Sequence, residues 1–135
     1  MYKYGKASKA RLDTCHEKLQ ILCNELIKYR DVSILCGHRD EKDQTEAYSK
    51  GLSKVKFPNS KHNIYPSLAV DMALYHKQAP HIHYSSRDEF LEFAGFVRGI
   101  AATLGIELRW GGDWDGDNDF TDQTFNDWVH WELVE

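Results

Sequence analysis

The sequence is poor in the features that mark several common protein classes. It has only three cysteines, Cys15, Cys23 and Cys36, and this odd number without a C-x-x-C pair argues against a disulfide framework. No apolar run approaches the roughly 20 residues of a membrane-spanning helix. The net charge of -4 and the pI of about 6.0 give no electrostatic reason to expect binding to nucleic acid. We therefore expect reduced thiols, no membrane insertion and no nucleic-acid partner.

The composition is nevertheless that of a folded domain. Of the 135 residues, 41% are hydrophobic and 13% are aromatic, which is enough to fill a core. This length predicts a single domain over residues 1–135. Residues 1–6 lack the apolar stretch of a signal peptide, so we expect synthesis in the cytosol.

The pattern of apolar residues and turn formers predicts alternating helices and strands. Helices are expected over residues 8–30, 41–50 and 86–104, and strands over residues 32–36, 68–74, 106–110 and 129–134. Asp40 is a suitable N-cap for the second helix, and Ser86 and Glu89 have the spacing of a capping box. This order favours a small α+β fold with helices packed on a mainly antiparallel sheet.

One acidic residue, Asp71, lies inside a predicted apolar strand, and His62 lies near the end of the loop before it. A buried carboxylate is costly unless it is paired or binds a metal. The two residues are therefore either a pair of metal ligands or a hydrogen-bonded aspartate with a surface histidine. Their spacing does not decide between these, because it is not a helical metal motif.

A second pair lies at the end of the chain. His130 alternates with its neighbours on the last predicted strand, and Asp127 precedes it by three residues. Two imidazoles, one carboxylate ligand and a further carboxylate are the parts of a catalytic zinc site, with water in the fourth position and a base beside it. The alternative is that His130 is a packed strand residue and Asp127 caps the strand.

Several motifs in one order resemble a known family. They are Gly37-His38-Arg39 followed by Gln44, Ser60-Lys61-His62, Ala69-Val70-Asp71, Trp110-Gly111-Gly112-Asp113-Trp114 and Asp127-Trp128-Val129-His130. The chain resembles the zinc peptidoglycan peptidases of the D-alanyl-D-alanine carboxypeptidase superfamily, and more closely the small phage L-alanyl-D-glutamate endopeptidases. The likeness begins near Tyr4 and reaches the C-terminus. Residues 63–68 form a longer spacer than is common in the family.

The resemblance implies a Hedgehog/D-Ala-D-Ala-peptidase-like fold and a set of roles. His62, Asp71 and His130 would bind zinc, Asp127 would be the general base, and Arg39 would stabilise the oxyanion. For Arg39 the alternative is a surface salt bridge with a neighbouring acidic residue.

Two further residues carry substrate-binding roles by the same resemblance. Ser60 would contact the substrate or position the neighbouring histidine, and Gln44 would contact the substrate.

The implied function is hydrolysis of the L-Ala–D-Glu bond of peptidoglycan stem peptides by a monomeric phage endolysin. It would be made in the host bacterial cytoplasm and reach the cell wall through a holin-type lesion. Two alternatives stay open: a D,D-carboxypeptidase or dipeptidase acting on D-Ala-D-Ala, and a non-catalytic wall-binding or Ca²⁺-binding module.

An acidic loop offers a separate hypothesis. It contains five aspartates, Asp113, Asp115, Asp117, Asp119 and Asp122. Closely spaced carboxylates suit Ca²⁺, and some phage members of the resembled family have a calcium-responsive loop here. The spacing is not that of an EF-hand, and the alternative is a solvated acidic loop.

A second group of histidines lies in the segment after the second predicted strand. His81 and His83 form an H-x-H pair, and alternating histidines can bind a metal. The sequence places no carboxylate or third histidine close to this pair. We therefore expect His81 and His83 to lie on a loop near the substrate groove, or to have no role, and we expect none for His76.

Overall fold

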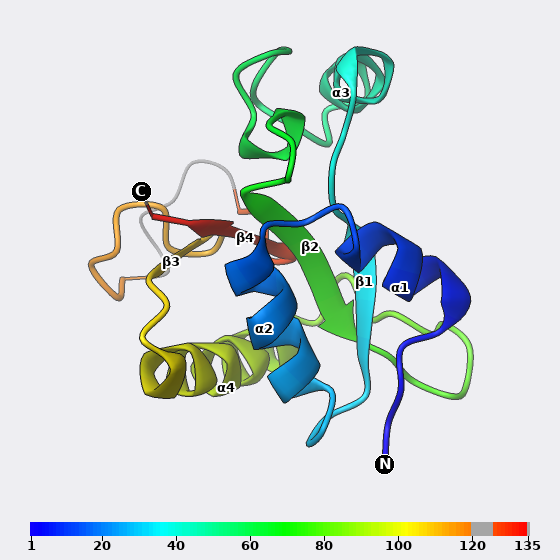
Figure 1. Cartoon of the computed structure of the whole chain (residues 1–135), viewed down its shortest axis with the longest axis vertical. Helices are drawn as coiled ribbons and strands as arrows, with labels where there is room; N and C mark the ends of the chain where they lie inside the picture. Colours follow the sequence, from blue (N-terminus) through cyan, green and yellow to red (C-terminus); the bar gives the residue numbers. More distant parts are fainter. Residues whose placement is uncertain (120–125, 135) are drawn as a thin grey trace.

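The computed structural model describes residues 1–119 and 126–134. Within this part of the chain, four α-helices and a four-stranded sheet form the fold (Figure 1). The helices are α1 (Lys6–Leu12), α2 (Glu17–Leu26), α3 (Glu41–Ser49) and α4 (Arg87–Leu104), with a 3₁₀ helix η1 (Lys61–Asn63). The strands are β1 (Val32–Cys36), β2 (Ala69–Leu74), β3 (Leu108–Trp110) and β4 (His130–Leu133). The sheet order is β1-β2-β4-β3 and all neighbouring strands are antiparallel, which confirms the expected α+β class.

The prediction of one helix over residues 8–30 is wrong, because the chain forms two helices there. The His16 N–H donates to the Ser67 carbonyl at 2.8 Å instead of to a carbonyl one turn earlier. The His16 ring then accepts a hydrogen bond from the Lys18 N–H and caps α2. The apolar residues keep their spacing of three and four across this break, so periodicity alone does not reveal it.

The sheet has one apolar face and one face that carries polar groups. Val70 and Met72 of β2 belong to the apolar core, together with Trp131 of β4 and the inner faces of α2 and α4. These two helices contact each other and cover that face of the sheet (Figure 1). Because side chains alternate along a strand, Asp71 of β2 and His130 of β4 point to the opposite face.

The predicted ends of the other helices are confirmed to within one residue. The Asp40 side chain accepts from the Asp43 N–H at the start of α3, and the Ser86 hydroxyl accepts from the Glu89 N–H at the start of α4. Gly105 ends α4 with a φ of 70°, a left-handed conformation that glycine adopts without steric cost. The short strands β3 and β4 lie inside the predicted ranges.

The segment between β1 and β2 extends away from the helical layer (Figure 1). It contains α3 and η1, and it joins β1 to β2. Gly37, at its start, packs so closely on the turn between α1 and α2 that a Cβ atom would collide with the Arg11 carbonyl and the Thr14 hydroxyl. The same Thr14 hydroxyl accepts from the His38 N–H at 2.8 Å. This contact fixes where the segment leaves the sheet.

The described residues bear on two expectations from the sequence. Cys15, Cys23 and Cys36 are free thiols, and the first two are buried in the core. No helix among the described residues is both long and apolar enough to cross a lipid bilayer.

The close packing at Gly37 gives a prediction about stability. We expect Gly37→Ala to lower the free energy of unfolding by about 1–3 kcal/mol, because the added methyl group forces backbone atoms apart. Gly95→Ala is the matched control: its Cβ would enter open space in α4, and we expect a gain of about 0.5–1 kcal/mol. Urea unfolding measures both, and an unchanged midpoint for Gly37→Ala would contradict the packing argument.

Candidate active site

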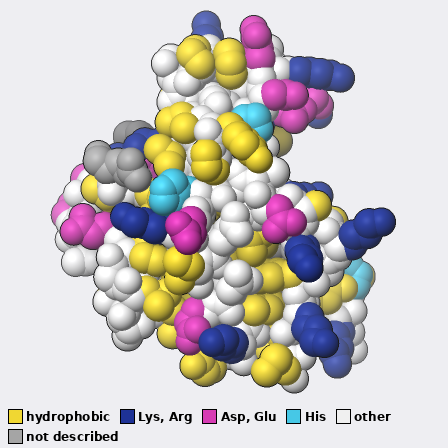
Figure 2. Space-filling view, in the orientation of Figure 1, with side chains coloured by type: hydrophobic (Ala, Val, Ile, Leu, Met, Phe, Trp, Pro, Cys, Tyr) yellow, Lys and Arg dark blue, Asp and Glu magenta, His cyan; other side chains and the backbone are white. Residues whose placement is uncertain are grey.

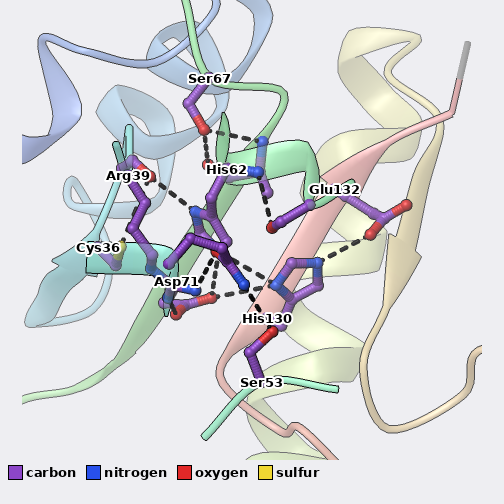
Figure 3. A network of polar contacts seen from close by, with 12 residues as sticks. Cys36, Arg39, Ser53, His62, Ser67, Asp71, His130 and Glu132 are labelled. Atoms are coloured by element: carbon purple, nitrogen blue, oxygen red, sulfur yellow. Dashed lines mark hydrogen bonds and ion pairs between the residues drawn. The ribbon is translucent and has the colours of Figure 1, made fainter. Parts of the chain in front are cut away.

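Three side chains from three different elements meet on the polar face of the sheet (Figure 3). Asp71 and His130 are direct partners across the antiparallel β2–β4 pair, and His62 reaches them from η1. The His62 Nε2 lies 3.1 Å from the Asp71 Oδ1 and 3.2 Å from the His130 Nδ1, and the His130 Nδ1 lies 3.3 Å from the same Asp71 oxygen. All three residues are buried. The structure thus brings together the three residues that the sequence singled out as metal ligands.

Backbone contacts hold η1 in place over the sheet. The Ser60 hydroxyl accepts from the His62 N–H at 3.1 Å and caps this short helix. The His62 carbonyl accepts from the Arg39 N–H at 2.8 Å. Ser60 is therefore placed to position His62, which is one of the two roles expected for it.

Hydrogen bonds on the far side of each ring fix its tautomer. The His62 Nδ1 lies 2.7 Å from the Gly37 carbonyl, and the His130 Nε2 lies 2.9 Å from the Glu132 carboxylate. A carbonyl and a carboxylate only accept, so these two nitrogens carry the protons. In the neutral rings, the His62 Nε2 and the His130 Nδ1 therefore direct lone pairs at each other and at Asp71.

This donor set fits zinc. Three lone-pair atoms that face one another without a donor between them repel, and a cation relieves that repulsion. With metal–ligand distances of about 2.0–2.1 Å, ligand atoms of a tetrahedral zinc site lie about 3.3 Å apart. The three separations of 3.1, 3.2 and 3.3 Å match this spacing. Two imidazoles and one carboxylate leave a fourth position for water.

The electrostatics of the three groups are mutually dependent. Burial of the His62 ring opposes its charge, but Asp71 outweighs this effect and raises the pKa of His62 to about 10. The His130 ring responds in the same way, with a pKa raised to about 9 by hydrogen bonds to Asp71 and Glu132 against the effect of burial. Burial also opposes ionisation of Asp71, yet the two imidazoles hold its pKa well below the usual range. A cation held by these three groups would therefore take the place of the protons.

Asp127 lies beside this cluster, and its pKa is raised, whereas the pKa of Asp71 is lowered. Burial, and then the negative charge of Asp71, raise the pKa of Asp127 to about 6, despite the opposing effect of His130. The Asp127 N–H donates to the Gly111 carbonyl at 2.9 Å, and a Cβ on Gly111 would collide with the Asp127 carbonyl. Gly111 of the Trp-Gly-Gly-Asp-Trp motif is therefore required, because the backbone at Asp127 leaves no space for a Cβ.

Arg39 contacts the cluster from the opposite side of the carboxylate. One of its nitrogens lies 3.5 Å from the Asp71 Oδ2, and another donates to the Gln44 side-chain carbonyl at 3.0 Å. The alternative of a surface salt bridge between Arg39 and a sequence neighbour does not match this geometry. The remaining atoms of the Gln44 amide donate to Ser53 and to the Val55 carbonyl. Gln44 is fully buried and holds Arg39 and the loop after α3 in place. A contact between Gln44 and substrate stays a prediction.

The cluster opens into a cleft of about 590 Å³. Asp127 and His130 lie on one side, and the loop that follows α3 forms another wall through residues such as Leu52 and Val55. Both of these side chains are exposed hydrophobics. In the orientation of Figure 1, hydrophobic side chains are visible on the surface of the segment between β1 and β2 (Figure 2). Three cationic side chains, Arg39, Lys54 and Lys61, also line the cleft.

Three residues near the site carry no role in the sequence analysis. Glu132 is hydrogen-bonded to His130. The sequence could have indicated this contact, because residues two apart on a strand share a face. The backbone carbonyl of Gly37 carries no sequence signal. Cys36 lies with His62 and Asp71 in one group of possible ligands, which follows from its pairing with Asp71 across β1 and β2.

The acidic loop brings three of its five aspartates together. The carboxylates of Asp113, Asp115 and Asp117 lie within reach of one ion. One oxygen of Asp113 bonds to Arg98 and to the Asn118 N–H, and its other oxygen is buried without a hydrogen-bond partner. Asp119 is exposed and its N–H bonds to Asp117, and Asp122 lies outside the described residues.

Comparison with known proteins identifies relatives of the whole chain. The family model described as phage L-alanyl-D-glutamate peptidase matches residues 1–134. The L-alanyl-D-glutamate peptidase of Escherichia phage T5 is 30% identical over 139 residues, which cover 98% of each chain. The peptidoglycan L-alanyl-D-glutamate endopeptidase CwlK of Bacillus subtilis (strain 168) is 33% identical over 118 residues, covering 77% of this chain and 61% of the relative.

A solved structure agrees with these sequence matches. The crystal structure of the Serratia marcescens L-Ala D-Glu endopeptidase ChiX superposes with a TM-score of 0.74 and 25% sequence identity. The match covers 98% of this chain and 91% of that chain. The chain belongs to the family of phage L-alanyl-D-glutamate peptidases.

Proposed function

We propose that this protein is a zinc-dependent endopeptidase that hydrolyses the L-alanyl-D-glutamate bond of peptidoglycan stem peptides. The observation that carries the proposal is the convergence of three lone-pair atoms, from His62, Asp71 and His130, at the spacing of zinc ligands. The names of the relatives support the choice of bond.

The chain's own groups supply the proton transfers. Zinc, when bound by His62, Asp71 and His130, lowers the pKa of water to about 7 and polarises a carbonyl. Asp127 takes the proton from the attacking water and then gives it to the leaving amine of the D-glutamate residue. A pKa raised to about 6 suits both steps, because Asp127 is then ionised near neutral pH but still basic enough to hold a proton.

Arg39 would stabilise charge that develops during the reaction, and the two lysines of the cleft would bind substrate carboxylates. Arg39 lies at the cleft and beside Asp71, where a fixed cation stabilises oxygen charge that develops at the attacked carbonyl. Lys54 and Lys61 line the same cleft and complement a substrate with free carboxylates, such as a peptide containing D-glutamate.

The division of roles predicts separable losses. We expect Asp127→Asn to retain one zinc per active site and to lose turnover by about 10²–10⁴-fold, because only the proton transfer is removed. We expect His130→Ala to lose both zinc and turnover, because a ligand is removed. Metal analysis combined with a wall-lysis assay, with and without a chelator, measures both. Asp88→Asn is the control, since this carboxylate is exposed at the start of α4.

The bond cleaved separates this proposal from a D,D-carboxypeptidase or dipeptidase on D-Ala-D-Ala. We expect digestion of purified peptidoglycan to create new D-glutamate amino termini, which end-group analysis identifies. Release of D-alanine alone would refute the choice of bond. Wall binding without hydrolysis at any zinc concentration would favour a non-catalytic module.

We also propose that residues 1–135 work as one domain and as a monomer. The apolar core is a single cluster that extends from α1 to β4, which supports a single folding unit. The phage relative of the same peptidase name supports a role as an endolysin. Synthesis in the host cytoplasm and release to the wall through a holin-type lesion are part of this proposal.

A regulatory Ca²⁺ site in the acidic loop is a second proposal. The convergence of Asp113, Asp115 and Asp117, and the unpartnered buried oxygen of Asp113, favour a hard cation here. We expect Ca²⁺ to raise the melting temperature of the wild type in a thermal scan. We expect Asp115→Asn with Asp117→Asn to abolish this rise. An equal shift in that double variant would contradict the site.

A further inference from the structure

A second group of metal-binding side chains lies outside the candidate active site. His76, His83 and Glu89 place one ligand atom each within 4.8 Å of one another. The His76 Nε2 lies 2.8 Å from the Glu89 Oε1, and the His83 Nδ1 lies 3.4 Å from the same oxygen. The expectation of no carboxylate near the H-x-H pair is therefore wrong for His83. Glu89 is six residues further along the sequence, and the turn before α4 brings it back.

We propose that His76, His83 and Glu89 form a second site for a divalent transition-metal ion of the zinc class. Two imidazoles with one carboxylate make up a donor set that zinc binds in proteins, and it leaves one position for water. The separations of 2.8 and 3.4 Å bracket the roughly 3.3 Å between ligand atoms in a tetrahedral zinc site. Nitrogen donors select against Ca²⁺ and Mg²⁺, which prefer oxygen.

The surroundings of the three residues constrain two of them and leave room for the third. The backbone N–H of His76 donates to the His81 carbonyl at 2.8 Å, and the His81 ring donates back to the His76 carbonyl at 2.8 Å. Glu89 is fixed in the first turn of α4, where its N–H donates to the Ser86 hydroxyl. His76 and Glu89 are thus held in place before any ion binds, and His83 is the residue that can move.

Metal binding requires one ring to tilt. The rings of His76 and His83 are stacked, with centroids 3.7 Å apart and planes 7° from parallel. A bound ion lies near the plane of each ring, so the two lone pairs must converge instead of remaining parallel. The His83 side chain is 39% exposed, which leaves it room for this movement. The ion would replace the protons that now join the imidazoles to Glu89.

The position of this site connects it to the substrate groove. Tyr84 follows His83 and Phe90 follows Glu89, and both line a second hollow of about 750 Å³. Asp71 and Asp127 line the same hollow. An ion that joins the loop after β2 to the start of α4 therefore fixes one wall beside the candidate active site, without sharing a residue with it.

Metal stoichiometry tests this proposal independently of catalysis. We expect metal-free wild-type protein to bind two equivalents of Zn²⁺ in a calorimetric titration. We expect His83→Asn and Glu89→Gln each to weaken one of them at least tenfold. His16→Asn is the matched control, because His16 lies outside both groups and asparagine can keep its role as N-cap of α2, and we expect it to keep both equivalents.

Further titrations distinguish this site from the other two proposed ion sites. His130→Ala should lose the active-site equivalent and keep the second one, so the two proposals fail separately. Excess Ca²⁺ should not displace the second equivalent, whereas Zn²⁺ held by the acidic loop would be displaced. A single equivalent in the wild type, or unchanged titrations for both His83→Asn and Glu89→Gln, would overturn the proposal. Circular dichroism of each variant checks that it is folded.

Discussion

The site is organised around one buried carboxylate. Asp71 lies on β2, one of the two inner strands, where every neighbouring position is buried and removal of its charge from water costs several kcal/mol. That cost is offset only if cationic groups or a metal ion surround it. Both imidazoles contact its Oδ1, and Arg39 contacts its Oδ2. The positions of η1, of β4 and of the turn after β1 place His62, His130 and Arg39 around the Asp71 carboxylate.

Groups behind the proposed ligands orient the two imidazole rings. Glu132 and the Gly37 carbonyl accept hydrogen bonds from the outer N–H groups of the two imidazoles and thereby turn the lone pairs of the neutral rings inward. These supports depend on close backbone approach, which explains two glycines. Gly37 packs on the α1–α2 turn, and Gly111 packs on the Asp127 carbonyl, with no space for a Cβ at either position. Substitution at either glycine would move a support of the site.

Segments outside the sheet supply part of the walls of the cleft and of the second hollow. The loop after α3 is held by the fully buried Gln44, which joins it to Arg39. The loop after β2 is joined to α4 through Glu89 and its two histidines. The sheet thus supplies Asp71 and His130 of the proposed site, while two tethered loops line the space beside them, as is common where function lies on loops of a stable scaffold.

The sequence by itself determined the α+β class, the strand that contains Asp71 and the ends of α3 and α4, because apolar spacing and capping residues act over a few neighbouring positions. It also singled out the residues that meet in the site, through the order of their motifs. Only the tertiary structure decided the break between α1 and α2, since a hydrogen bond from His16 to distant Ser67 ends a pattern that remains helical in sequence. Likewise, the contact between His62 and His130, 68 residues apart, depends on strand register and chain reversal, which local spacing does not encode.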